Sequence, residues 1–199
     1  RYMEGRAVRN LIVGAIFLGL SASTKYNLGL FAGVVLIVAY QENDSLRANG
    51  GRLCWVVGVM AAAFIAGSPY VLLDFATFWR DLSYERLHFA RGHEADLGRG
   101  WWYHLGFTLP LGLGWPLFVA ALAGIGRWIW RPGGAEWPLL LGVVVYFVVA
   151  GSGKVTFMRY MLPLLPLLCL AAGGFIVALG RSTRGVVVLA LLVVAPTVW

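Results

Sequence analysis

The sequence predicts an all-α polytopic membrane protein with about seven transmembrane or half-membrane helices and one long extracytoplasmic loop that carries an interfacial helix. Of its 199 residues, 60% are hydrophobic and 13% are charged, whereas soluble domains are about 45–50% apolar and about 25% charged. The charged residues are also bunched, which leaves apolar runs close to the roughly 20 residues that a helix needs to cross a bilayer. These two observations exclude a soluble domain.

The apolar runs form a single transmembrane domain over residues 1–199. Its helices are expected at 10–23, 27–40, 53–70, 103–126, 137–151, 160–180 and 185 onward. Both ends read as internal to a longer chain, because there is no initiator Met and the last apolar run is still short of a full span at Trp199. The net charge of +7 does not indicate a nucleic-acid partner, because the Lys and Arg residues are scattered between apolar runs and form no patch.

The distribution of Lys and Arg between the short loops predicts the orientation in the membrane. Alternating spans place the N-terminus and the loops 41–52, 127–136 and 181–184 on one side. These segments hold Arg1, Arg6, Arg9, Arg47, Arg52, Arg127, Arg131, Arg181 and Arg184. The short loops of the other side hold only Lys25, Lys154 and Arg159. Short loops rich in Lys and Arg mark the cytoplasmic side, so these three cations are expected to face outward, and the sequon at Asn43 to remain unused.

The long loop, about 71–102, is therefore expected outside the cytoplasm. Its aromatic and leucine side chains recur near helical spacing from Phe75 to Phe89, which is typical of a helix lying in the membrane interface, and Asp74 is the expected N-cap. Trp101 marks one membrane boundary. An aromatic belt of Trp128, Trp130 and Trp137 is expected at the opposite boundary.

Lys25 lies at an unusual depth. One continuous helix over 10–41 would be about 48 Å long, too long for a hydrocarbon core of about 30 Å. We therefore expect a break at Thr24-Lys25-Tyr26-Asn27, with the turn below the outer surface and facing protein or a water-filled cavity. A Lys at that depth needs an anionic partner or a function. Snorkelling of Lys25 to the outer interface is the structural alternative.

A second basic turn, residues 151–160, brings Lys154 and Arg159 to the same side as Lys25. Its Gly-Ser-Gly-Lys string is not a phosphate-binding loop of a nucleotide hydrolase, because Val148 stands where that motif needs its first Gly and no strand precedes it. Pro163 and Pro166 are expected to loosen the first turns of the following span and to free backbone groups near Arg159.

The outer loop adds further basic and imidazole side chains, including Arg86, His88 and His93. They are either a solvated polar loop or contacts to a substrate, and the spacing of the two His is not a specific zinc pattern. Cys54 and Cys169 each lie inside an apolar run and are read as small core residues. No cofactor and no metal site are expected. The outward Lys, Arg and His side chains are the groups needed to hold an anionic lipid headgroup.

Four segments carry a resemblance to a known family. They are Gly19-Leu20-Ser21-Ala22-Ser23-Thr24-Lys25-Tyr26, Gly67-Ser68-Pro69-Tyr70, the stretch from Phe78 to His93, and Lys154-Val155-Thr156-Phe157-Met158-Arg159-Tyr160-Met161-Leu162-Pro163-Leu164-Leu165-Pro166. In this order and spacing, the chain resembles the polytopic GT-C glycosyltransferases of the protein mannosyltransferase and aminoarabinose transferase type (glycosyltransferase family 39-like), which use polyprenyl-phosphate sugars. The resemblance covers most of the chain.

The resemblance implies transfer of a sugar from a polyprenyl-phosphate carrier to a protein, lipid or glycan acceptor outside the cytoplasm, without a nucleotide-binding domain. The family's catalytic carboxylate would lie upstream of Arg1, so no acidic residue of this chain is assigned that role. By position, the resemblance makes Lys25, Lys154 and Arg159 contacts to the carrier phosphate. Further cavity or acceptor contacts are expected from Tyr26, Tyr160, Arg86, His88 and His93.

Two other readings stay open on the sequence. Buried cations and broken helices also occur in transporters and lipid flippases, although the chain shows no convincing internal repeat. A non-catalytic membrane subunit that binds lipids or partner proteins is the third. The Arg-, Gly- and Ala-rich composition leans toward a bacterial plasma (inner) membrane protein of the cell envelope.

Overall fold

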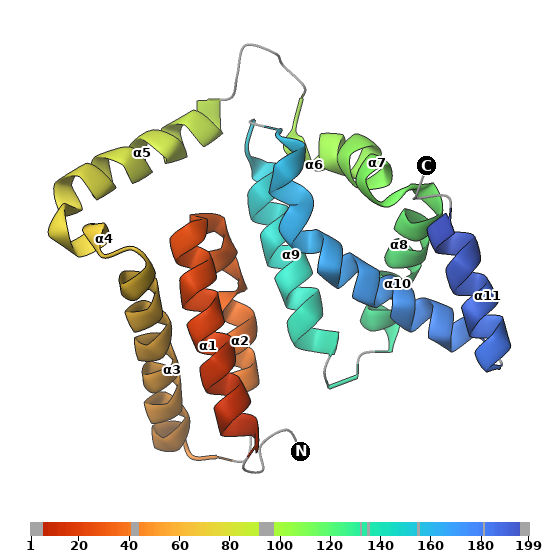
Figure 1. The fold of residues 1–199 in the computed structure, drawn as a ribbon, viewed down its shortest axis with the longest axis horizontal. Helices are drawn as coiled ribbons and strands as arrows, with labels where there is room; N and C mark the ends of the chain where they lie inside the picture. Colours follow the sequence, from red (N-terminus) through yellow and green to blue (C-terminus); the bar gives the residue numbers. More distant parts are fainter. Residues whose placement is uncertain are drawn as a thin grey trace. The chain divides into compact units, whose positions relative to one another are not determined.

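A computed structural model describes residues 6–40, 44–91, 98–131, 133–134, 136–154, 156–180 and 182–195. These residues contain helices and connecting turns and no strand, which confirms the all-α prediction (Figure 1). The chain divides into two compact units, unit 1 over Arg1–Leu87 and unit 2 over His88–Trp199. Each unit is described by itself.

Unit 1 is built around a helical hairpin and a third helix. Its elements are α1 (Arg6–Thr24), the 3₁₀-helix η1 (Tyr26–Phe31), α2 (Ala32–Ala39), α3 (Leu46–Gly67), α4 (Tyr70–Leu73) and the larger part of α5 (Phe75–Arg91). Helix α1 packs along α3. The two backbones approach closely at Gly19, where a Cβ atom would lie 2.8 Å from the Cβ atom of Ala63. Small side chains at such crossings let membrane helices pack tightly.

The core of unit 1 lies where α1, α2 and α3 meet. It is formed by the buried side chains of Leu11, Ala15, Ala39 and Val56, with Val35, Leu36, Leu53, Val59 and Met60 packed against them. The predicted break at Lys25 is confirmed, because α1 ends at Thr24 and Lys25 has an extended backbone (φ −152°, ψ 110°) before η1 begins. The following segment differs from the expected span 27–40 in that its first six residues form a 3₁₀-helix.

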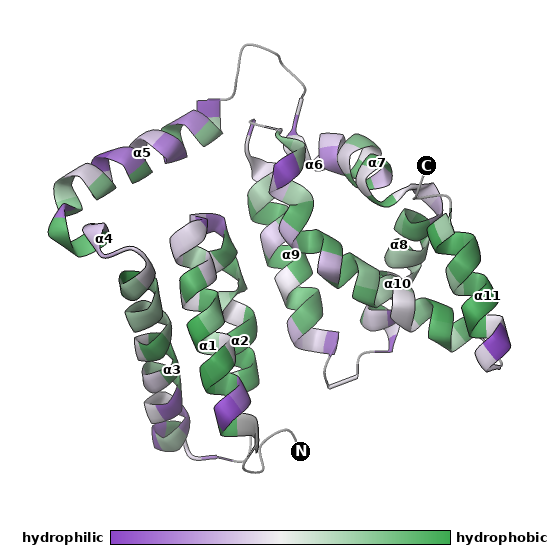
Figure 2. Ribbon diagram, in the orientation of Figure 1, coloured by the Kyte–Doolittle hydropathy of each residue, from purple (hydrophilic) through white to green (hydrophobic). Residues whose placement is uncertain are grey.

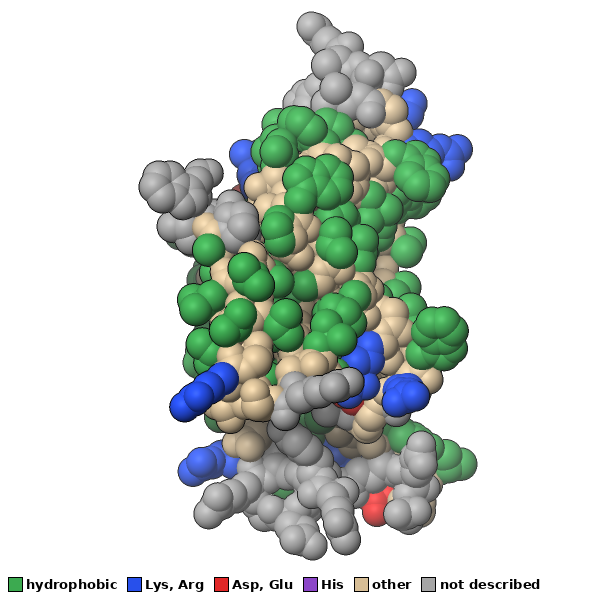
Figure 3. Space-filling view, turned by 90° about the vertical axis from the view of Figure 1, so that its right-hand side faces the viewer, with side chains coloured by type: hydrophobic (Ala, Val, Ile, Leu, Met, Phe, Trp, Pro, Cys, Tyr) green, Lys and Arg blue, Asp and Glu red, His purple; other side chains and the backbone are tan. Residues whose placement is uncertain are grey.

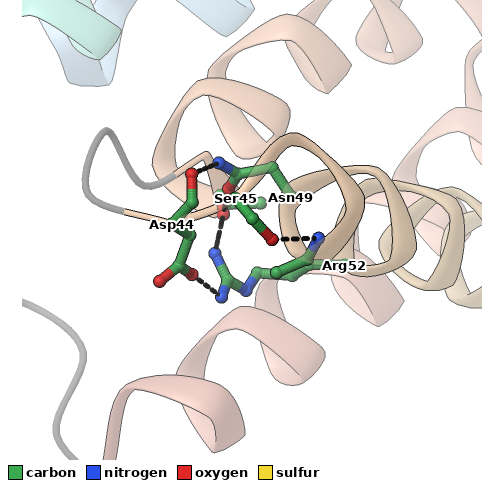
Figure 4. A network of polar contacts seen from close by, with 6 residues as sticks. Asp44, Ser45, Asn49 and Arg52 are labelled. Carbon is green, nitrogen blue, oxygen red and sulfur yellow. Dashed lines mark hydrogen bonds and ion pairs between the residues drawn. The ribbon is translucent and has the colours of Figure 1, made fainter.

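A polar network closes the connection between α2 and α3 (Figure 4). Arg52 donates to the carbonyl oxygen of Ala39 at 3.1 Å and to Asn49 Oδ1 at 3.2 Å, and it forms an ion pair with Asp44. Asn49 is buried, and Ser45 caps α3 by accepting from the backbone N–H of Ala48 at 3.2 Å. Arg52 therefore links the C-terminal end of α2 to the first turn of α3 by hydrogen bonds.

Helix α5 is the helix expected in the long loop. Asp74 caps it as predicted, since its Oδ1 accepts from the backbone N–H of Thr77 at 3.2 Å. Figure 2 shows hydrophilic residues interspersed with hydrophobic ones along α5, whereas α3, α10 and α11 are mostly hydrophobic. The ring of Phe75 stacks on that of Trp79, with centroids 6.3 Å apart.

Unit 2 contains the remaining helices. They are α6 (Gly100–Tyr103), the π-helix η2 (His104–Thr108), α7 (Leu109–Leu113), α8 (Trp115–Trp130), α9 (Glu136–Ser152), the 3₁₀-helix η3 (Met158–Leu164), α10 (Leu165–Leu179) and α11 (Thr183–Val194). The strongest packing is between α8 and α10, and part of the core is formed by Trp128, Leu140 and Ala171.

The span expected at 103–126 is sharply bent, because the segments Gly100–Leu113 and Trp115–Trp130 meet at an angle of 118°. The bend lies at Gly114, whose φ of 73° is in the left-handed region that favours glycine. Pro116 follows in the first turn of α8, where a missing N–H is tolerated.

Two helices among the described residues are long and apolar enough to cross a membrane, Leu46–Gly67 and Met158–Leu179, and the bent pair makes a third if it counts as one span. Four further apolar helices are shorter, at Val8–Thr24, Tyr26–Ala39, Glu136–Ser152 and Thr183–Val194. The chain thus has the composition of a membrane protein, with two or three helices of spanning length where about seven whole or half spans were expected.

Two sequence-based assignments of side-chain environment are wrong. Cys54 and Cys169 are exposed and free, not core residues, because a position inside an apolar run can face lipid instead of another helix. Trp128 is buried in the core of unit 2 and does not belong to a boundary belt, whereas Trp130 and Trp137 are exposed.

Candidate functional site

The turn that carries Lys25 is held in place by two other segments of unit 1. Ser68 Oγ donates to the carbonyl oxygen of Ser23 at 3.3 Å, and a Cβ atom at Gly67 would lie 2.9 Å from Ser23 Cβ. The ring of Tyr26 packs edge-on against Phe78 of α5, with centroids 5.9 Å apart. The end of α3 and the start of α5 therefore fix the position of the break. Lys25 is half-buried and Tyr26 is half-exposed.

In unit 2, the end of α5 packs on the turn that carries Lys154. The backbone N–H of Lys154 donates to the carbonyl oxygen of Phe89 at 3.2 Å. A Cβ atom at Gly153 would lie 2.6 Å from Cε1 of Phe89, so this close contact requires glycine. The Phe89 ring also meets Tyr160 at a centroid distance of 6.1 Å. Phe89 thus fixes both sides of the 153–160 turn.

The start of α6 supports the same turn from another side. A Cβ atom at Gly100 would lie 2.7 Å from the carbonyl oxygen of Gly151 and 2.9 Å from that of Gly153. Trp101 Nε1 donates to the carbonyl oxygen of Val148 at 2.9 Å. A Cβ atom at Gly151 would meet that indole, 2.9 Å from Nε1. The Gly-Ser-Gly string therefore makes room for Phe89, Trp101 and a crossing backbone, and its glycines have this packing role here.

Arg159 and Tyr160 lie at the start of η3, where a proline changes the backbone hydrogen bonding. Pro163 has no N–H, so it cannot make the 3₁₀ hydrogen bond to the carbonyl oxygen of Tyr160. The hydroxyl of the fully buried Tyr146 donates to that oxygen at 2.8 Å. The loosening predicted from Pro163 is confirmed as a 3₁₀ segment. The exposed guanidinium of Arg159 lies over the Phe157 ring, 4.4 Å from its centroid.

The other sequence-predicted site residues fall in different parts of the chain. Arg86 is exposed on the part of α5 that belongs to unit 1, and His88 is half-buried on the part that belongs to unit 2. His93 lies outside the described residues. Unit 2 therefore brings together the turn with Lys154, the residues Arg159 and Tyr160, and the end of α5, while Lys25 and Tyr26 belong to unit 1.

His104 is a polar residue that the sequence reasoning missed. It is fully buried, on the π-helix η2, which contacts η3. Its Nδ1 shares a hydrogen bond of 3.0 Å with Thr108 Oγ1, and its Nε2 is buried with no hydrogen-bond partner among the described residues. The available signal was a His inside an apolar run, which in a membrane protein marks a functional candidate.

The described part of the site offers positive charge. In unit 2, Lys154 and Arg159 are exposed cations at the two ends of a turn whose backbone is held by packing. Arg and Lys are the groups that compensate phosphate, Arg by two parallel hydrogen bonds. No group of three or more His, Cys, Asp or Glu side chains that could hold a metal ion occurs in the described part of the chain.

Comparison with known proteins leaves the structure to stand by itself. No protein-family model, no curated protein and no solved structure matches this chain. The fold of the described residues belongs to the class of all-α proteins with apolar helices of membrane-spanning length.

Proposed function

We propose that this chain is part of a membrane glycosyltransferase that transfers a sugar from a polyprenyl-phosphate carrier to an extracytoplasmic acceptor. The observation that carries the proposal is the pairing of the four segments on which the family resemblance rests. Within unit 1, the segment ending in Lys25-Tyr26 contacts Gly67-Ser68. Within unit 2, the end of the Phe78-to-His93 stretch contacts the segment from Lys154 to Tyr160.

These contacts support a binding role because they place packed residues next to basic side chains. Lys154 and Arg159 lie next to Gly153 and Tyr160, on which Phe89 packs, and groups that are already packed in place lose less entropy when they bind an anion. Apolar helices next to such cations offer a surface for the polyprenyl chain. A polyprenyl-phosphate carrier has a phosphate that the cations could bind and a long hydrocarbon chain that the apolar helices could contact.

The proposed reaction is a displacement at the anomeric carbon. A carboxylate, which the resemblance places upstream of Arg1, takes the proton of an acceptor hydroxyl, and the oxygen forms a bond to the anomeric carbon. The bond from that carbon to the phosphate oxygen breaks, and the polyprenyl phosphate leaves with the electron pair. Lys154 and Arg159 stabilise the charge that the leaving phosphate gains.

The test is transfer activity of the intact enzyme, reconstituted with a polyprenyl-phosphate-linked sugar and an acceptor. Arg159→Ala is expected to lower kcat/KM by roughly 100-fold, the size of loss seen for one donor to a developing charge. Arg47→Ala is the matched control, an exposed arginine at the opposite end of the predicted topology. Full activity of Arg159→Ala and Lys154→Ala in folded protein would refute the proposed roles.

Transport is the second candidate, and the bend at Gly114 favours it. A span broken at an angle of 118° is a feature of transporter binding sites, where discontinuous helices surround the substrate. Reconstituted protein that moves the lipid-linked sugar between leaflets without releasing polyprenyl phosphate would support transport over transfer.

A further inference from the structure

Helices α8 and α10 leave a groove between them at one end of unit 2. They approach closely at Gly124, where a Cβ atom would lie 3.0 Å from the Cα atom of Ala171, and Ala121 and Ala172 are fully buried nearby. Small residues allow this contact. Toward the C-terminal ends of both helices, a cavity of about 870 Å³ opens between Gly126 and Phe175.

The groove has an apolar wall and a basic rim. Phe175 and Leu179 of α10 form one side, and Trp130, which is 89% exposed, stands at its edge on α8. Arg127 and Arg131 also line it, four residues apart and therefore on one face of the helix end. Figure 3 shows hydrophobic side chains in a band across the middle of this face, with Lys and Arg side chains above and below the band.

The charge of the groove is uncompensated within the described chain. No Asp or Glu lines it, and neither Arg127 nor Arg131 forms an ion pair with a described residue. Glu136, the next acid along the chain, lies against Gly133 and does not line the groove. Two guanidinium groups beside an apolar channel complement a ligand that has an anionic head and a hydrocarbon tail.

We propose that this groove binds an anionic phospholipid, with its phosphate at Arg127 and Arg131 and one acyl chain along Phe175 and Leu179. Trp130 covers the headgroup level, where tryptophan is favoured. The site is separate from the basic turn at residues 153–160, because the 17 residues of α9, about 26 Å of helix, lie between the two ends of unit 2. It does not depend on the proposed transferase activity.

The test places the intact chain in lipid nanodiscs of phosphatidylcholine that contain a photoactivatable phosphatidylglycerol, and maps the crosslinks by mass spectrometry. A photoactivatable phosphatidylcholine is the matched probe. We expect phosphatidylglycerol to crosslink preferentially to the groove. The double variant Arg127→Gln/Arg131→Gln should lose roughly 30-fold of this crosslinking, since each of the two basic residues near a membrane surface contributes about 1 kcal/mol to binding anionic lipid. Arg47→Gln should keep it.

A second variant tests the groove without changing the charge that orients the chain. A Cβ atom at Gly126 would meet nothing within 4 Å, so Gly126→Leu fills the groove without disturbing the helix contact at Gly124. It should exclude the acyl chain and abolish the groove crosslinks while the protein stays folded. Equal crosslinking by both lipids, or a Gly126→Leu variant that keeps the preference for phosphatidylglycerol, would overturn the proposal.

Discussion

The hydroxyl of Tyr146 donates to the carbonyl oxygen of Tyr160 over 2.8 Å, and so bonds the middle of α9 to the first turn of η3. The bond lies where Pro163 removes the backbone donor that a 3₁₀-helix would otherwise supply. Tyr146 is fully buried, and buried hydroxyl groups are almost always hydrogen-bonded. A side chain thus completes the backbone hydrogen bonding of the segment that carries Arg159.

Tyr146→Phe should lower the free energy of unfolding by about 1 kcal/mol, the net contribution of one intramolecular hydrogen bond. Equilibrium unfolding in detergent would measure it. Tyr103→Phe is the control, since the hydroxyl of this half-buried tyrosine makes no hydrogen bond with another described residue. Equal stability of the two variants would contradict the role assigned to Tyr146.

Gly100→Ala should destabilise unit 2, because the new methyl group meets the carbonyl oxygens of Gly151 and Gly153. Backbone atoms cannot rotate away as a side chain can, and such overpacking costs about 1–3 kcal/mol. Thermal unfolding would show a lower Tm. At Gly112, where a Cβ atom meets nothing within 4 Å, the same substitution should leave the Tm unchanged or raise it. A lower Tm for Gly112→Ala alone would contradict the packing described here.

Arg52→Lys should weaken the connection between α2 and α3 while keeping the charge. The guanidinium uses Nη1 for Ala39 and Asn49 and Nη2 for Asp44, whereas a lysine has a single nitrogen and lacks this planar fork. The expected loss of stability is roughly 1–2 kcal/mol. Arg47→Lys, at an exposed arginine of the same helix, should have no effect. Chemical denaturation of both variants measures the difference, and an unchanged Arg52→Lys would show that charge alone matters.

The end of α9 and the start of α3 allow a test of orientation. In a background of Cys54→Ser and Cys169→Ser, a membrane-impermeant maleimide applied to intact cells should label Ser152→Cys. It should label Ala48→Cys only after the membrane is permeabilised, because the distribution of Lys and Arg places that helix end inside. Labelling of both positions from the same side would refute the predicted orientation.

The sequence predicted the features of this fold that depend on neighbouring residues. The break at Lys25 follows from the length of the apolar run, the cap at Asp74 from residue type before a helical pattern, and the irregular start of η3 from Pro163. Each of these signals lies within a few residues of its effect, so one chain is enough to read it.

The features that the sequence did not predict depend on which helices meet. Whether Cys169 or Trp128 faces lipid or protein is set by the partner of its helix, and both lie in similarly apolar surroundings along the chain. The contact of Gly100 with Gly151 joins residues distant in sequence. The bend at Gly114 requires a positive φ that glycine permits but does not impose.

The π-helix at His104–Thr108 is equivalent to one residue inserted into a regular α-helix. Each residue turns an α-helix by about 100°, so the insertion sets which side of α7 faces inward. Leu109, Pro110 and Leu113 are buried in this register. A homologue that lacked one residue between 104 and 108 would turn these side chains outward unless a second deletion or insertion followed before Gly114. We therefore expect homologues that differ in length in the π-helix to carry a second, compensating length change before Gly114.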